Sequence, residues 1–173
     1  MALVDNNILS SLAKIDRLDL LPSVFETVKT PPSVIDELDR AEVDGYEFVS
    51  RIDAVKLYND GWLEIAAPTG AELELADDIA DHALSSTDAR CLAIASQRDA
   101  RLVTDDAHVG TRGKQLDVEV WDLVLLLQAA IHRDVIATSE GLSTLVDELR
   151  EQDGYRFSEA DRNSLFETVD KDV

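Results

Sequence analysis

Residues 101–106 read Arg-Leu-Val-Thr-Asp-Asp, a short apolar run that ends in a threonine and two acids. A related pattern opens the chain, where the run Ala2-Leu3-Val4 is followed at once by Asp5. Both apolar runs are typical of buried strands. Ligand sites in open α/β sheets lie beyond the carboxyl ends of the strands. If both strands are central and parallel, the acids that follow them meet at one edge of the sheet.

Apolar runs and helical patterns alternate along the rest of the chain. Further strands are predicted at residues 27–30, 62–66 and 118–120. Helices are predicted at 8–15, from 32 onward, and at 46–58, 85–98, 123–131, 142–150 and 158–166, with a short one opening at 105–106, whereas the acidic stretch 69–84 has no clear pattern. Strands separated by helices predict right-handed crossovers and a mostly parallel sheet covered on both faces. The predicted fold class is α/β.

The length of 173 residues predicts one domain, 1–173, with C-terminal helices at about 141–170 packing on it. No apolar run approaches the length of a membrane span, and no basic-then-apolar leader opens the chain, so we expect a cytoplasmic protein with no membrane partner. The single cysteine, Cys91, excludes an internal disulfide and a multi-cysteine zinc site.

The charge is strongly acidic, with 36 acidic and 16 basic side chains and a formal net charge of −20. The acids are mostly aspartate, 23 of them, while only 5 residues are lysine. This composition favours a halophilic origin, because salt near 1 M shortens the Debye length to about 3 Å and screens the self-repulsion. An acidic protein from ordinary ionic surroundings is the alternative. The global charge argues against a nucleic-acid binder that uses a broad basic patch.

One acid of the helix that begins near Pro32 lies close to its apolar face. Val34, Leu38 and Ala41 form that face, and Glu37 lies about 60° from Val34 around the helix. Asp36 lies about 200° away and is expected to face water. A carboxylate near the core is costly unless it is paired or bound to a cation. A glutamate at the edge of the face that reaches out to water remains the alternative.

Asp88 follows the cluster Ser85-Ser86-Thr87 and begins a helical face that continues through Cys91 and Ala95. It can cap the helix, bind a ligand, or do both. The same two roles are open to the acids that follow the strands. Carboxylates at strand ends and helix starts predict a shared cation with oxygen ligands, Mg²⁺ or Mn²⁺, held by Asp5, Glu37, Asp88, Asp105 and Asp106.

Four segments, taken in order, resemble the PIN-domain nucleases, the family that includes VapC-type toxins of toxin–antitoxin pairs. They are Val-Asp-Asn-Asn at 4–7, Pro-Ser-Val-Ile-Asp-Glu-Leu at 32–38, Thr-Asp-Ala-Arg-Cys-Leu-Ala-Ile-Ala at 87–95 and Leu-Val-Thr-Asp-Asp at 102–106. Residues 102–127 and the segment Leu-Arg-Glu-Gln-Asp-Gly-Tyr-Arg-Phe-Ser at 149–158 resemble an archaeal and bacterial PIN subgroup of poorly defined role.

The resemblance implies a three-layer α/β/α fold and a metal-dependent ribonuclease that hydrolyses RNA phosphodiester bonds. It implies catalytic, metal-binding acids at Asp5, Glu37, Asp88 and Asp106, with Asp105 at a position where the family varies. It also implies a homodimer and a small antitoxin as partner. Candidate substrate contacts are Asn7 and Thr104, which match polar positions of the family, and Arg112, Lys114 and Arg90, which lie near the acids in sequence.

Two other functions remain open. A PIN-type binding or scaffold module that has lost catalysis would keep the same acids. A Mg²⁺-binding receiver domain would need an aspartate after a middle strand and a lysine after a late one. The run 62–66 ends without aspartate, and the last predicted strand leads to Trp121-Asp122 without a lysine. Dinucleotide binding is disfavoured because no G-x-G-x-x-G follows a strand.

Overall fold

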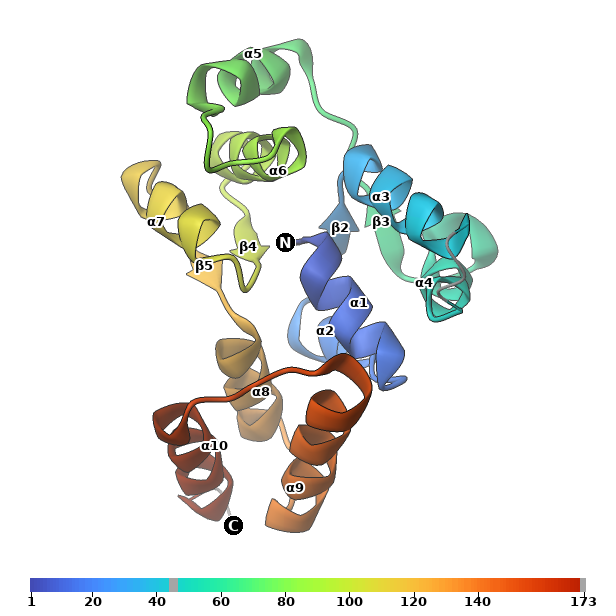
Figure 1. Ribbon diagram of the computed structural model, residues 1–173, viewed down its shortest axis with the longest axis vertical. Helices are drawn as coiled ribbons and strands as arrows, with labels where there is room; N and C mark the ends of the chain where they lie inside the picture. The colour runs from blue at the N-terminus through green and yellow to red at the C-terminus, as the bar shows by residue number, and fades with distance from the viewer. Residues whose placement is uncertain (44–46, 172–173) are drawn as a thin grey trace.

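The computed structural model describes residues 1–43 and 47–171 and has a parallel β-sheet at its centre (Figure 1). The sheet has five strands in the order β3-β2-β1-β4-β5, and all its pairs are parallel. The strands are β1 (Ala2–Val4), β2 (Val28–Thr30), β3 (Leu63–Ile65), β4 (Arg101–Val103) and β5 (Val120–Trp121). The α/β prediction is confirmed. The strand order reverses beside β1, which makes the β1/β4 edge a switch point of the kind where ligands bind in such sheets.

Helices connect the strands and cover the sheet. The helices are α1 (Asn6–Lys14), α2 (Leu20–Val24), α3 (Pro32–Val43), α4 (Val49–Val55), α5 (Gly70–Ile79), α6 (Ser86–Gln97), α7 (Ala107–Gln115), α8 (Leu123–His132), α9 (Ser139–Glu148) and α10 (Glu159–Lys171), with a 3₁₀ turn η1 (Leu57–Asn59) and a π-helical turn η2 (Leu149–Asp153). The chain extends the sheet outward from β1 in both directions, and the right-handed crossovers that are the rule for parallel strands place helices on both faces of such a sheet. No helix among the described residues is long and apolar enough to cross a bilayer.

The register of β1 and β4 brings the ends of the two strands to the same level. Leu3 pairs with Leu102, and Val4 pairs with Val103. Asp5 continues the ladder, because its backbone N–H donates to the carbonyl of Val103 at 3.2 Å. The side chains of Asp5 and Thr104 therefore leave the sheet side by side.

The structure departs from the predicted elements in several places, and it adds helix α2, for which no helix was predicted. The helix expected over 46–58 begins at Tyr46, which lies outside the described residues, and α4 ends at Val55 because Lys56 is extended and bridges to Leu63. The unassigned stretch 69–84 contains α5, which opens with a capping box between Thr69 and Glu72. The last strand starts two residues later than predicted, because the N–H of Val118 closes the turn after α7.

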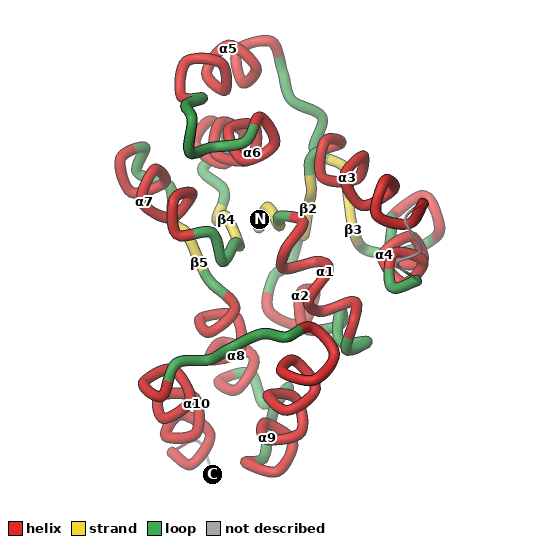
Figure 2. The backbone as a smooth tube through the Cα atoms, in the orientation of Figure 1, coloured by secondary structure: helices red, strands yellow, loops and turns green. Residues whose placement is uncertain are grey.

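The buried apolar side chains form one cluster that joins the sheet to its helices. Leu3, Leu102 and Leu92 are fully buried at its centre, and Leu145 of α9 and Leu165 of α10 extend it toward the C-terminus. α10 packs on α8 and α9, and η2 packs on α1. The loop from η2 to α10 crosses in front of α8 (Figure 2). This loop brings residues late in the chain next to the strand ends.

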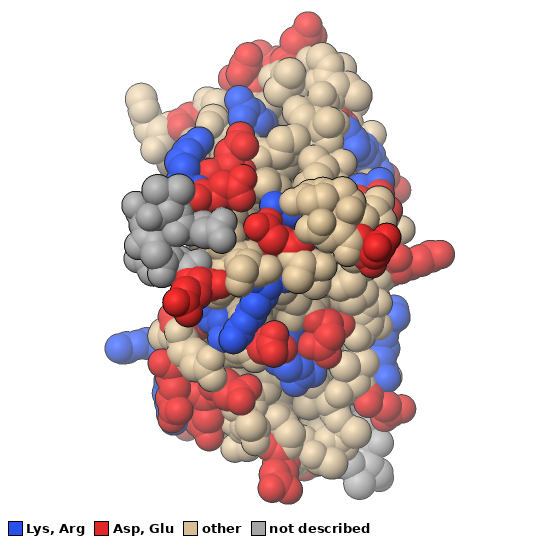
Figure 3. Space-filling model, turned by 90° about the vertical axis from the view of Figure 1, so that its right-hand side faces the viewer, with Lys and Arg blue, Asp and Glu red and all other residues tan. Residues whose placement is uncertain are grey.

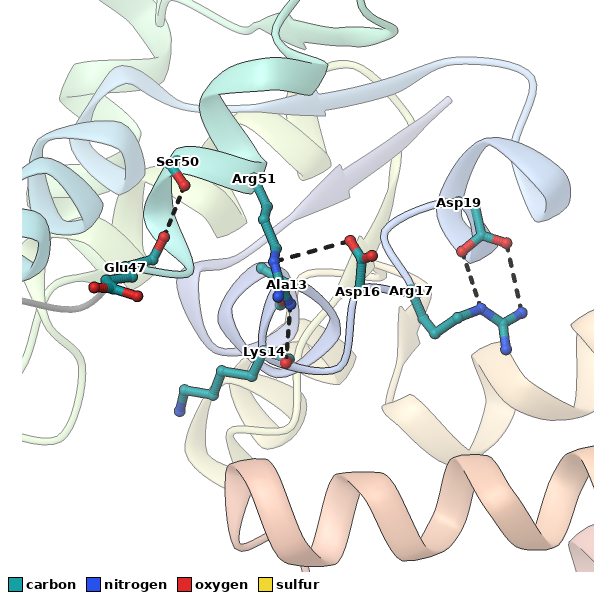
Figure 4. A network of polar contacts seen from close by, with 8 residues as sticks. All are labelled: Ala13, Lys14, Asp16, Arg17, Asp19, Glu47, Ser50 and Arg51. Atoms are coloured by element: carbon teal, nitrogen blue, oxygen red, sulfur yellow. Dashed lines mark hydrogen bonds and ion pairs between the residues drawn. The ribbon is translucent and has the colours of Figure 1, made fainter.

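Helix α1, which begins directly after Asp5, is also held at its other end (Figure 4). Arg51 of α4 donates from Nη1 to the carbonyl oxygens of Ala13 and Lys14 at 2.7 and 3.1 Å. A cation at this position satisfies the last carbonyl groups of the helix and complements its dipole. The contact fixes α1 against α4 and so steadies the helix that Asp5 caps.

The surface mixes the two signs of charge in spite of the net charge of −20. On the face drawn in Figure 3, acidic side chains are spread widely with basic side chains between them. Ion pairs account for several of these basic groups, such as Lys29 with Glu64 at 2.6 Å. Other arginines, Arg156 and Arg162 among them, make no ion pair with the residues that the structure describes.

Candidate carboxylate site

Asp5 lies at the centre of the candidate site and is only 6% exposed. It is the N-cap of α1, and its Oδ1 accepts the backbone N–H of Ile8 at 3.0 Å. Its Oδ2 accepts the hydroxyl of Thr104, which is also buried. The carboxylate is thus fixed by one bond from its own helix and one from the end of the neighbouring strand.

Burial raises the pKa of Asp5 from its usual 3.8 to about 7. The hydrogen bonds from Ile8 and Thr104 act in the opposite direction, whereas the carboxylates of Asp105 and Asp88 raise the pKa further. Desolvation and nearby like charges both disfavour an ionised carboxylate. Asp5 is therefore a buried acid whose pKa is raised by burial and by neighbouring carboxylates.

Glu37 reaches the same region from α3 and is held by two side chains. Its Oε1 accepts the hydroxyl of Thr87 at 2.6 Å, and its Oε2 accepts Nδ2 of Asn6 at 3.3 Å. Glu37 is half-buried while Asp36 is exposed, as the helical phase predicted. Of these two neighbouring acids, Glu37 is therefore the one that faces the candidate site.

Asp88 both caps α6 and lies near the other acids. Its Oδ2 accepts the backbone N–H and the hydroxyl of Ser85 at 3.1 and 2.7 Å, which completes a capping box. The thiol of Cys91, fully buried below it, has its pKa raised by burial and then by the carboxylates of Asp5, Asp88 and Glu37. The carboxylates of these three acids therefore lie close enough to Cys91 to act on its thiol.

The two acids after β4 point in different directions. Asp106 caps α7, where its Oδ1 accepts the N–H groups of His108 and Val109 at 2.7 and 3.1 Å. Asp105 accepts the N–H of Leu123 at 3.0 Å and the hydroxyl of Tyr155 at 3.2 Å. Burial raises the pKa of Asp105 as well. Asp105 thus ties the strand end to α8 and to the C-terminal loop.

An open hollow of about 470 Å³ lies in front of Asp105 and Asp106. Its wall includes Asn7, His108 and Tyr155. The lining also includes a cluster in which Asp153 of η2 accepts hydrogen bonds from Lys14 Nζ at 2.6 Å and from the hydroxyl of Ser11 at 2.7 Å. The hollow is large enough for part of a nucleotide chain and has carboxylates at its base.

Several residues of the site have no signal of their own in the amino-acid sequence. Asn6 and Thr87 hold Glu37, and each is the immediate neighbour of a predicted acid. Lys14, Asp153 and Tyr155 enter through the packing of η2 against α1. For Asp153 and Tyr155, the segment 149–158 and its likeness to the PIN subgroup was the one indication.

The candidate phosphate contacts lie elsewhere. Arg112 and Lys114 occupy the last turn of α7, about 9 and 12 Å along the helix from Asp106. Arg112 donates to Oε1 of Gln115 at 2.7 Å and lies near Asp81. Arg90 is half-buried on α6, and Thr104 donates its hydroxyl to Asp5. Of the predicted substrate contacts, Asn7 is the one that lines the hollow.

The donor set suits a hard divalent cation, because it consists of carboxylate oxygens. Among the described residues, however, no three His, Cys, Asp or Glu side chains are arranged so that they could hold a metal ion. Asp88 and Asp106 are turned toward their caps, and Oδ1 of Asp88 and Oδ2 of Asp106 accept no hydrogen bond from residues 1–43 and 47–171. Carboxylate oxygens are thus the right type of ligand for such an ion, and Asp88 and Asp106 each keep one oxygen available for it.

The protein is therefore an α/β protein with a parallel sheet, and its candidate site consists of acids that lie beyond the carboxyl ends of the central strands. The chain belongs to the PIN-domain family, since the model of a family described as a PIN domain (DUF3368) matches residues 1–171. This confirms the resemblance to PIN domains and excludes the receiver-domain alternative.

The fold is also similar to a solved structure, the crystal structure of VapBC2 from Rickettsia felis bound to a DNA fragment from their promoter. The TM-score is 0.51 at 14% sequence identity, and the match covers 70% of this chain and 98% of that one. At this identity the likeness supports the fold. No curated protein matches the sequence significantly.

Proposed function

We propose that this protein is a metal-dependent endoribonuclease of the PIN family. The observation that carries the proposal is the buried Asp5 at the switch point of the sheet, whose pKa of about 7 reflects burial and neighbouring carboxylates. Such a group is stabilised by a cation. Asp5, Glu37, Asp88 and Asp106 would hold Mg²⁺ or Mn²⁺, with Asp105 at the edge of the site.

A divalent ion held by these residues would polarise a phosphodiester oxygen and lower the pKa of a bound water. The chain's own part is to fix the donors beforehand. Thr104 and the N–H of Ile8 fix Asp5, and Thr87 and Asn6 fix Glu37. Asp88 and Asp106 each offer the oxygen that their helix cap leaves unused. The hollow before Asp106 then receives the RNA strand.

The proposed partners are those of the family and of the similar structure. PIN domains include the VapC-type toxins of toxin–antitoxin pairs, and the similar structure is that of VapBC2 from Rickettsia felis, bound to a DNA fragment from their promoter. We extend to this chain the role of a toxin that forms a homodimer, is restrained by a small antitoxin and acts on RNA in the cytoplasm.

The test is RNA cleavage by purified protein with Mg²⁺ or Mn²⁺, at low and at molar KCl. Asp5→Asn and Asp106→Asn should each abolish cleavage, because an amide removes a negative charge where the cation needs it. Asp36→Asn, on the exposed side of α3, is the matched control and should cleave like the wild type. Circular dichroism checks that the folds are equal. Full cleavage by both site variants would overturn the assignment.

A PIN-type binding module without catalysis is the second candidate. It is favoured by the capping roles of Asp88 and Asp106, which occupy one oxygen of each in purely structural bonds. Such a module would bind RNA with Mg²⁺ or Mn²⁺ present and leave it intact. The same cleavage assay therefore separates the two functions.

A further inference from the structure

A second cavity, of about 410 Å³, meets the carboxylate hollow at Tyr155, which lines both. Its wall carries three arginines, Arg150, Arg156 and Arg162, together with the ring of Phe157. We call Arg150, Tyr155, Arg156, Phe157 and Arg162 the arginine–aromatic pocket. They lie on η2, on the loop that follows it and on the first turn of α10, in the lower half of the molecule in Figure 1.

Two of the three arginines have charges that the protein does not neutralise. Arg156 and Arg162 are exposed and make no ion pair or side-chain hydrogen bond with the residues described here, 1–43 and 47–171. Arg150 differs, because it pairs with Asp147 and Glu151 at 3.1 and 3.5 Å. In a chain of net charge −20, two unpaired guanidinium groups on one cavity form a local attraction for an anion.

Asp161, which precedes Arg162 in the sequence, makes its hydrogen bonds elsewhere. Asp161 accepts the backbone N–H and the hydroxyl of Ser158 at 3.3 and 2.6 Å and so caps its own helix. The guanidinium groups of Arg156 and Arg162 are left with forked donors that match the oxygens of a phosphate.

The aromatic half of the pocket offers a stacking surface. The rings of Tyr155 and Phe157 lie 4.6 Å apart between centroids at 52°, and both are partly exposed. The hydroxyl of Tyr155 is tied to Asp105 at 3.2 Å, which fixes the ring between the two cavities. Proteins that bind single-stranded nucleic acids use aromatic rings beside arginines, since every base has a face that can stack on a ring.

We propose that the arginine–aromatic pocket binds a nucleotide of single-stranded RNA next to the segment held at the carboxylates. Arg156 and Arg162 bind its phosphate, and its base stacks on Tyr155 or Phe157. The strand runs from the hollow before Asp106 across Tyr155. This rests on the proposed function, and it explains how so acidic a protein holds RNA. An acidic peptide also carries anions, but it has no base for the rings and no reason to continue toward the carboxylates.

The test is binding of a short fluorescent oligouridylate, followed by anisotropy in EDTA so that nothing is cleaved, over a series of salt concentrations. The double variant Arg156→Gln/Arg162→Gln should weaken binding at least tenfold. It should also lower the slope of log K against log salt by about 0.7 for each phosphate that is no longer neutralised. Arg40→Gln is the matched control. Arg40 is exposed on α3, likewise makes no ion pair with the described residues, and α3 lies far from the pocket in Figure 1, so its loss should leave the slope unchanged.

Tyr155 gives an independent pair of variants. Tyr155→Leu should weaken binding about fivefold or more, whereas Tyr155→Phe keeps the ring, loses only the hydrogen bond to Asp105 and should weaken binding less. If Tyr155→Leu fails to fold, the double variant of the exposed Arg156 and Arg162 still decides the test.

If the arginine double variant and the wild type have equal RNA affinity and equal salt slope, the arginine–aromatic pocket does not bind RNA and the proposal is wrong. If that variant instead loses affinity for an oligoglutamate peptide alone, the pocket is a peptide site and the proposal is wrong. The two proposals fail separately. RNA held through the pocket but never cleaved with Mg²⁺ or Mn²⁺ contradicts the nuclease, and RNA cleaved but held equally by both proteins contradicts the pocket.

Discussion

The hydroxyl of Thr104 donates a hydrogen bond to the carboxylate of Asp5, so the ends of β4 and β1 are joined by two side chains 99 positions apart in sequence. Both side chains are buried. This bond favours the ionised form of Asp5 and works against the burial that raises its pKa to about 7. Thr104 thus fixes the orientation of the Asp5 carboxylate and lowers its pKa.

Replacing the hydroxyl should move the pH dependence of RNA cleavage. Thr104→Val removes the bond at nearly constant volume, so the pKa of Asp5 should rise and the acidic limb of the pH–rate profile should shift to higher pH. Thr104→Ser should restore the wild-type profile. Thr111→Val is the control, because that hydroxyl bonds to the carbonyl of Ala107 within α7. An unshifted profile for Thr104→Val would show that the bond does not control Asp5.

Glu37 and Asp36 should differ strongly although they are neighbours. Glu37→Gln should lower the cleavage rate at least tenfold, which corresponds to about 1.4 kcal/mol in the barrier. Asp36→Asn should change it little, since that side chain faces water. Single-turnover rates at saturating Mg²⁺ measure both. Equal losses would contradict the inward orientation of Glu37.

Without metal, the charge of Asp5 should cost stability as the pH rises. Its pKa is higher in the folded chain, about 7, than the 3.8 of an exposed aspartate, so the folded state binds the proton more tightly. The stabilisation from protonation is complete below pH 4 and is lost as the pH rises through 7. Each tenfold difference in proton affinity corresponds to about 1.4 kcal/mol.

Asp5→Asn cannot lose that proton, so it should gain a few kcal/mol of stability relative to the wild type between pH 4 and pH 8. Urea unfolding in EDTA across this range measures the difference. Parallel stability profiles of the two proteins would contradict the raised pKa.

Mg²⁺ or Mn²⁺ should stabilise the fold, and more at low salt than at high salt. A cation that binds only the folded chain adds about 2.7 kcal/mol at a hundredfold excess over its Kd. For a chain of this size the melting temperature should rise by roughly 5–10 °C. Molar KCl screens the same repulsion between carboxylates and should shrink the increment.

Asp88→Asn is the informative variant for this measurement. Ions that act on the surface alone would stabilise it as much as the wild type, whereas a site that includes Asp88 loses most of the increment. An undiminished metal response in Asp88→Asn would count against Asp88 as a ligand.

The sequence by itself determined the α/β class, the order of the elements and the acids that follow strands or begin helices. These features are local. An apolar run reveals a buried strand, and 100° per residue is enough to separate Glu37 from Asp36. The capping residues of α6 and α7 were equally readable, because a cap is a contact between residues three apart or fewer.

Only the tertiary structure decided how the acids are used. Asp105 and Asp106 are adjacent in the chain, yet Asp106 caps α7 while Asp105 bonds to Leu123 and Tyr155. The arrival of η2 and the following loop at the strand ends also depends on packing. A contact such as that of Tyr155 with Asp105 spans 50 positions and leaves no periodic trace in the sequence, because it depends on the packing of η2 against α1.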